Sequence, residues 1–178
     1  DADAGVRAVA ISALAQIASS PTEMAPAVSR LRDPERTVRE AAARALAARP
    51  AGPSTLPVLL DLFKDPAMAP FAAPAVGALR LKEGVEPLTR LLSSTDAPTR
   101  RGAARGLTRL GPLAAPAADA LLRALQQETS EAAPCDYWNA LAEIGPAGAS
   151  KMAEARRLMG ETKAASCDEA RAALAAPH

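Results

Sequence analysis

Three arginines form the pattern in this sequence that is best suited to binding an anion. Arg101, Arg105 and Arg109 are spaced four residues apart, which places them on one face of a helix. Each guanidinium presents a planar fork of donors that matches the oxygens of a carboxylate or a phosphate. The stripe therefore predicts a contact surface for an acidic partner. The alternative is a solvent-exposed helix face in which Glu143 is near enough to pair with Arg109.

Two adjacent aromatic residues, Tyr137 and Trp138, are a second candidate for binding. The whole chain has one Trp, one Tyr and two Phe, so a neighbouring pair is unusual in it. The simpler interpretation is that the rings pack against the last helix expected in the chain, at about residues 164–175. The alternative is an exposed anchor for a partner, because Trp and Tyr dominate the energetics of many interfaces.

Several classes of function lack the residues that they need. His178 is the only histidine and is the final residue, so acid–base or triad catalysis by histidine has no candidate. A net charge of +1 gives no strong attraction to nucleic acid. No apolar run approaches the roughly 20 residues that span a bilayer. We therefore predict no catalytic residue, cofactor or metal, no nucleic-acid binding and no membrane insertion.

A phrase that returns about every 30 residues indicates the architecture. It consists of an arginine, several alanines and a closing leucine, and it occupies residues 7–14, 39–46 and 100–107. Weaker copies end at Leu79 and Leu141. A fixed period in this range is the signature of a stacked-repeat array. The alanine-rich, aromatic-poor composition suits short helices that pack closely.

Helical spacing of apolar residues divides each unit into two helices, called here the first and second helix of a pair. The sequence predicts one all-α domain of about five pairs followed by a terminal helix. The expected units are about 1–32, 33–64, 65–94, 95–128 and 129–160, with the terminal helix at 161–178. The chain opens inside a repeat and has no initiator methionine, which predicts a fragment of a longer protein.

Two cysteines, Cys135 and Cys167, occupy nearly equivalent positions one repeat apart, on helices expected to be neighbours. A disulfide between them is compatible with that arrangement and would fasten the terminal helix to the fifth unit. Two unpaired thiols are the alternative. A bonded pair favours a periplasmic or secreted location, whereas free thiols favour the cytoplasm. Two cysteines without a nearby histidine argue against a zinc site.

The repeated phrase also resembles a known family. Val38-Arg39-x-x-Ala42-x-x-Ala45-Leu46, preceded by Asp33-Pro34, resembles a HEAT repeat. Leu110-Gly111-Pro112 and Ile144-Gly145-Pro146 are similar to junctions in short bacterial HEAT-like repeats, a group that includes repeats named after phycobilisome lyases.

The resemblance implies a right-handed superhelix of antiparallel helix pairs. It places the second helices on the concave side and the first helices on the convex side. It further implies that Arg7, Arg39 and Arg100 hydrogen bond to adjacent units.

In such families the usual role is protein–protein binding, and a minority are enzymes or enzyme subunits. We therefore predict a non-catalytic scaffold, a monomer or part of a larger chain, that binds another protein. The expected surface is the concave face or the stripe of Arg101, Arg105 and Arg109. The alternatives are an enzyme or lyase-like accessory subunit, and a structural spacer in a larger secreted or envelope protein.

Overall fold

The computed structural model describes residues 3–128 and 134–175, and within them the chain is helical, with no strand. The start of the predicted fifth unit and the end of the predicted terminal helix lie outside the described residues. The first helices are α1 (Ala4–Ile17), α3 (Arg36–Ala48), α5 (Ala69–Ala78), α7 (Ala97–Leu110) and α9 (Pro134–Glu143). The second helices are α2 (Ala25–Arg30), α4 (Leu56–Asp61), α6 (Val85–Leu91), α8 (Ala118–Gln126) and α10 (Pro146–Met159), and α11 (Glu161–Ala175) follows them. The predicted all-α repeat fold is confirmed.

Local signals explain where these helices begin. The Asp3 carboxylate accepts a hydrogen bond from the Val6 amide at 3.0 Å, and that of Asp96 accepts one from the Thr99 amide at 2.9 Å. Such caps satisfy amide groups that have no partner inside the helix. The second helices α2, α4, α6 and α8 each follow a short 3₁₀ turn: Pro21–Met24, Pro53–Thr55, Lys82–Gly84 and Gly111–Ala117.

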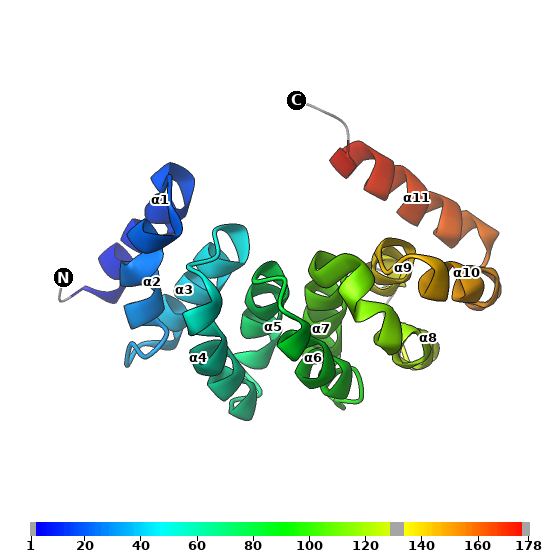
Figure 1. The fold of residues 1–178 in the computed structure, drawn as a ribbon, viewed down its shortest axis with the longest axis horizontal. Helices are drawn as coiled ribbons and strands as arrows, with labels where there is room; N and C mark the ends of the chain where they lie inside the picture. The colour runs from blue at the N-terminus through cyan, green and yellow to red at the C-terminus, as the bar shows by residue number, and fades with distance from the viewer. Residues whose placement is uncertain (1–2, 129–133, 176–178) are drawn as a thin grey trace.

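The helix pairs stack in one curved row, with the first and second helices on opposite sides of it (Figure 1). Consecutive first helices pack directly on one another, whereas neighbouring second helices contact one another far less. The inner side of a curved stack is the side on which its elements are closest together. The first helices therefore line the concave side, and the prediction that the second helices would do so is wrong.

Small residues on α5 and α7 are the physical reason for this curvature. A Cβ atom added to Gly77 would lie 2.1 Å from the carbonyl oxygen of Gly106. One added to Gly102 would lie 2.6 Å from the carbonyl oxygen of Pro70. The two helix backbones therefore touch at these glycines. The second helices bury leucines in the core of the row: Leu59, Leu88 and Leu121.

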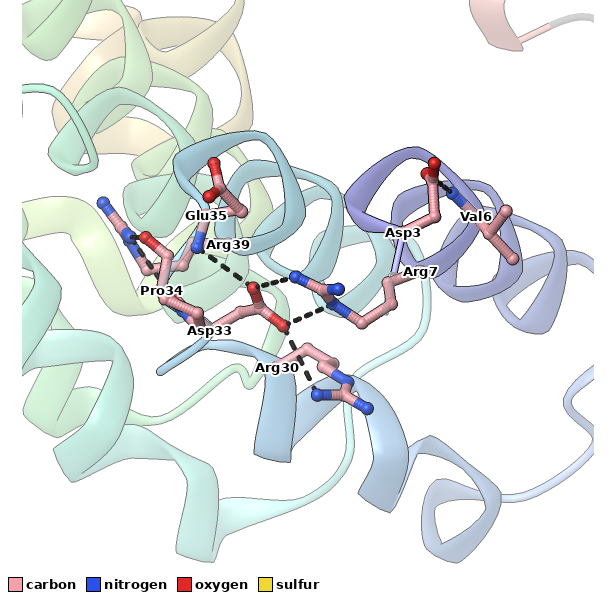
Figure 2. Close-up of polar contacts among 8 residues, drawn as sticks. All are labelled: Asp3, Val6, Arg7, Arg30, Asp33, Pro34, Glu35 and Arg39. Carbon is pink, nitrogen blue, oxygen red and sulfur yellow. Dashed lines mark hydrogen bonds and ion pairs between the residues drawn. The ribbon is translucent and has the colours of Figure 1, made fainter. Parts of the chain in front are cut away.

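A buried carboxylate, that of Asp33, joins the first two units (Figure 2). Arg7 donates two hydrogen bonds to it, from Nε at 3.0 Å and from Nη2 at 2.9 Å. The same carboxylate accepts from Arg30 and from the Glu35 amide. The hydrogen bonds from Arg7 lower the pKa of Asp33, although burial alone acts to raise it. The carboxylate is thus held ionised at the centre of the junction.

Equivalent arginines repeat this role along the row. Arg39 lies 3.9 Å from the carboxylate of Asp65, and Arg100 lies 3.5 Å from that of Glu128. Both arginines also donate to carbonyl groups in the loop before their own helix. With Arg7 they form a ladder of cations: Arg7 and Arg39 reach an acid at the start of the next unit, and Arg100 reaches Glu128 at the end of its own unit. The ladder fixes the spacing of the units and leaves these arginines occupied.

Of the large apolar residues that remain exposed in the described structure, three lie on α1, and Leu113 and Leu158 lie elsewhere. Val6, Val9 and Ile17 of α1 are exposed. In the described part of the chain no helix is both long and apolar enough to cross a membrane.

Candidate functional site

The predicted arginine stripe lies on α7, among the first helices that form the concave side. Arg105 and Arg109 are exposed, and Arg101 is half-buried. The buried Nε atom of Arg101 has no hydrogen-bond partner in the described structure. These arginines line a groove of about 490 Å³ with residues of α3 and α5. We call it the basic groove, and its further lining includes Arg44, Ala47, Pro70, Phe71 and Pro74.

Arg44 and Phe71 complete the groove opposite the stripe. The Arg44 guanidinium lies 4.4 Å from the centre of the Phe71 ring, within the range of a cation–π interaction. Arg44 is exposed and also pairs with Glu40 at 3.4 Å. Sequence reasoning did not select either residue. A signal for Arg44 was present, because it occupies in the second unit the repeat position that Arg105 occupies in the fourth.

The stripe also links its helix to the next unit. Arg105 Nε donates to the Asp136 carboxylate at 2.8 Å and so connects α7 with α9. The basic groove thus contains four guanidiniums and only two neighbouring carboxylates, those of Glu40 and Asp136. Its floor is apolar where Phe71 and the prolines lie. This combination offers hydrogen-bond donors for anions beside a surface for apolar side chains.

A second and larger hollow, of about 940 Å³, continues from the groove towards the C-terminal end. We call it the end pocket. It is lined by the ends of α3 and α7, by α9 and by the facing side of α11. Ala47 and Arg109 line both hollows, and Arg109 donates from Nη1 to the Ala47 carbonyl oxygen between them. Although Arg109 is exposed overall, partial burial of its guanidinium lowers its pKa, and the charge of Arg105 lowers it further.

The carboxylates of the end pocket have cationic partners already. Glu143 pairs with Arg171 at 3.2 Å, which corrects the alternative in which Glu143 pairs with Arg109. Asp168 pairs with Arg156 at 3.3 Å and accepts a hydrogen bond from Trp138 Nε1 at 2.8 Å. Both acids are therefore engaged by the elements that close the C-terminal end.

Tyr137 and Trp138 are fully buried on α9. The Tyr137 hydroxyl donates to Glu128 at 3.0 Å, and the Arg156 guanidinium lies 5.2 Å from the centre of the Trp138 ring. The hydrogen bond to Asp168 joins Trp138 to α11, so the rings pack against the last helix, as the simpler interpretation of the sequence predicts. The alternative of an exposed aromatic anchor is wrong, because no ring surface is left for a partner.

Residues 1–80 match the family model for HEAT repeats. A crystal structure of an engineered protein from the Northeast Structural Genomics Consortium has a TM-score of 0.62 and is 23% identical in sequence. The alignment covers 95% of this chain and 90% of that chain, so the likeness in fold extends well past the HEAT-repeat match. No curated protein matches the sequence.

Beyond the matched HEAT repeats, a disulfide fastens the last helix to the row. Cys135 on α9 and Cys167 on α11 are bonded, with their Cα atoms 5.2 Å apart. Cys167 and Ala164 of α11 are fully buried. With the contacts of Asp168 and Arg171, the bond holds α11 as one wall of the end pocket. The described residues contain no cluster of histidine, cysteine or carboxylate side chains arranged to hold a metal ion.

The single tyrosine of this HEAT-like solenoid gives a direct test of its burial. Burial, with the hydrogen bond to Glu128 and the charge of that group, raises the pKa of Tyr137 to about 12. The unfolded chain should titrate near the ordinary value of 10.0. Because the folded pKa is the higher one, the contribution of this group to stability is complete below the unfolded pKa and is lost as the pH rises through the folded one. We expect the tyrosinate absorbance to appear near pH 12 in native protein and near pH 10 in urea. Coinciding midpoints would contradict the burial.

Proposed function

We propose that this protein is a non-catalytic scaffold that binds an acidic segment of another protein in the basic groove. HEAT repeats commonly mediate protein–protein interactions. The observation that carries the proposal is the meeting of the Arg101, Arg105 and Arg109 stripe with Arg44 across the concave side. The stripe and the concave face, which were alternatives in the sequence, are one surface.

The composition of the groove favours a polypeptide over a nucleic acid. Its cations are local, because the whole chain has a net charge of only +1. A nucleic acid would need a long basic track to neutralise many phosphates. An acidic peptide needs only a few guanidinium contacts, together with apolar surface such as that of Phe71 and the neighbouring prolines. The local positive charge and the lining of both arginines and apolar residues therefore support a polypeptide partner.

Charge reversal at two of the exposed guanidiniums, those of Arg44 and Arg105, provides the test. The probe is a fluorescently labelled octaglutamate peptide, with an octaglutamine peptide as the neutral control, and binding is followed by anisotropy at low and high salt. We expect Arg44→Glu combined with Arg105→Glu to weaken binding of octaglutamate by about tenfold or more at low salt. The difference should shrink as salt rises, because screening weakens contacts between exposed charges.

A matched control keeps the change in net charge constant. Arg123 on α8 and Arg157 on α10 are exposed residues of second helices. The double change to glutamate at these positions should leave the affinity unchanged within about twofold. Equal losses in the two double variants would mean that only net charge matters, and no binding by the native protein would also refute the proposal.

A further inference from the structure

The end pocket lies where the basic groove stops. Its lining runs from the C-terminal end of α3 to Arg171 and Ala172 of α11. Figure 1 shows α11 rising beyond α9 at the C-terminal end of the row, on the side of the first helices. A peptide that lies along the groove towards α9 therefore meets α11 as a wall. The bound peptide would therefore end at α11 or reverse its direction there.

Two guanidiniums of the end pocket have no carboxylate partner in the described structure. These belong to Arg80 and Arg109, both of which line the end pocket. The acids in the same lining are engaged: Glu143 by Arg171, and Asp168 by Arg156 and Trp138. Partial burial of the Arg109 guanidinium lowers its pKa, although the residue as a whole is exposed. The lining of the pocket therefore has an excess of positive charge.

The backbone at Arg80 strengthens this observation. Arg80 has φ of 54° and is the only residue other than glycine with a positive φ in the described ranges. Glycine adopts this conformation without the steric cost that an L side chain incurs. An arginine at such a position carries a guanidinium to the pocket, where its Nη2 lies 3.8 Å from the site that a Cβ on Gly111 would occupy. Backbone strain of this kind is often found at binding sites.

An unpaired acceptor accompanies the two cations. Asn139 of α9 lines the end pocket, and its Oδ1 atom is buried without a hydrogen-bond partner among the described residues. A peptide terminus offers a carboxylate for guanidiniums and, on the neighbouring Cα, an amide N–H for such an acceptor. An internal acidic side chain holds its carboxylate further from its own amide N–H, and its backbone would have to continue past α11.

We propose that the end pocket binds the C-terminal carboxylate of the acidic segment, with Arg80 and Arg109 as its guanidinium contacts. This inference rests on the proposed function, because it specifies which end of the partner the groove receives. It defines the partner chemically as a protein with an acidic C-terminal tail.

The test compares two labelled peptides of equal charge, hexaglutamate with a free C-terminus and heptaglutamate with an amidated C-terminus. We expect the native protein to bind the free acid at least about tenfold more tightly than the amide. The amide lacks the terminal carboxylate and so loses its charge-assisted hydrogen bonds to the guanidiniums. Arg80→Gly should abolish this preference and leave binding of the amide unchanged. Glycine suits the positive φ at this position, so the variant should fold normally.

Arg109→Gln provides a second variant, and Arg123→Gln on α8 is the control that removes the same charge elsewhere. The control should retain the preference, and Arg109→Gln should lose most of it. Equal affinity of the native protein for the two peptides, or a preference that survives both pocket variants, would overturn the inference. If the inference failed in this way, the double variant Arg44→Glu, Arg105→Glu would still show whether the basic groove binds acidic peptides. Failure of both peptides to bind would refute the proposed function as well.

Discussion

We expect Trp138→Ala to lower the free energy of unfolding by about 3–5 kcal/mol, as for loss of a large buried aromatic side chain. The Trp138 ring is fully buried, and its Nε1 donates to Asp168 of α11 at 2.8 Å. Truncation leaves a cavity between α9 and α11 and removes one partner of a carboxylate that lines the end pocket. Urea denaturation followed by circular dichroism measures the change.

Two further variants separate packing from hydrogen bonding at this position. Trp138→Phe keeps most of the ring but removes the donor, so we expect a smaller loss of about 1–3 kcal/mol. Leu113→Ala serves as a control because Leu113 is exposed, and it should change the stability by less than about 0.5 kcal/mol. A loss for Trp138→Ala no larger than that of Leu113→Ala would contradict the burial of the ring.

The second large effect is expected at the contact between α5 and α7. A Cβ at Gly77 would lie 2.1 Å from the carbonyl oxygen and 2.6 Å from the Cα of Gly106. These are backbone atoms, so the clash can be relieved only by moving the two helices apart. We expect Gly77→Ala to reduce the stability by about 3 kcal/mol, as for severe overpacking. The reduction comes despite the higher helix propensity of alanine.

Gly5 of α1 provides the matched comparison, because it is an exposed helical glycine. The added Cβ would meet only a carboxylate oxygen of Asp3 at 3.0 Å, and that side chain can move. Gly5→Ala should therefore be neutral or stabilising by up to about 1 kcal/mol. Thermal denaturation of both variants measures the contrast. If they change the melting temperature equally, the first helices do not approach as closely as described.

The repeated phrase was sufficient to predict the helices and their stacking. Regular spacing of small and apolar residues is a local property, so it can be read from one unit at a time. The role of Arg7, Arg39 and Arg100 followed from the resemblance to HEAT repeats for the same reason. Arg7 and Arg39 each reach an acid of the next unit, and Arg100 donates to the Ser94 carbonyl of the preceding one.

The direction of curvature was predicted wrongly because it depends on a comparison between two rows of helices. Gly77, Gly102 and Gly106 were visible in the sequence, yet their effect appears only when α5 and α7 are known to face each other. Three glycines in two consecutive first helices are a usable signal. They indicate that the first helices, and not the second, form the inner side of the stack.

The candidate site was predicted only where its residues share one helix. The stripe of Arg101, Arg105 and Arg109 was found from spacing alone, whereas Arg44, Phe71 and Arg80 lie on other units. The end pocket also depends on the placement of α11, which no periodic pattern determines. Tyr137 and Trp138 show the converse, since their types left an exposed anchor as the alternative to packing, and the structure buries both rings.

The disulfide between Cys135 and Cys167 also bears on how the solenoid responds to a pulling force. Units that contact only their neighbours separate one after another when the ends of the row are drawn apart. The bond carries tension directly between two residues that are 32 positions apart, so the chain between them is bypassed. That interval would otherwise release about 110 Å of extended chain. Elastic extension is therefore confined to the units before α9, and the wall of the end pocket keeps its shape while they stretch.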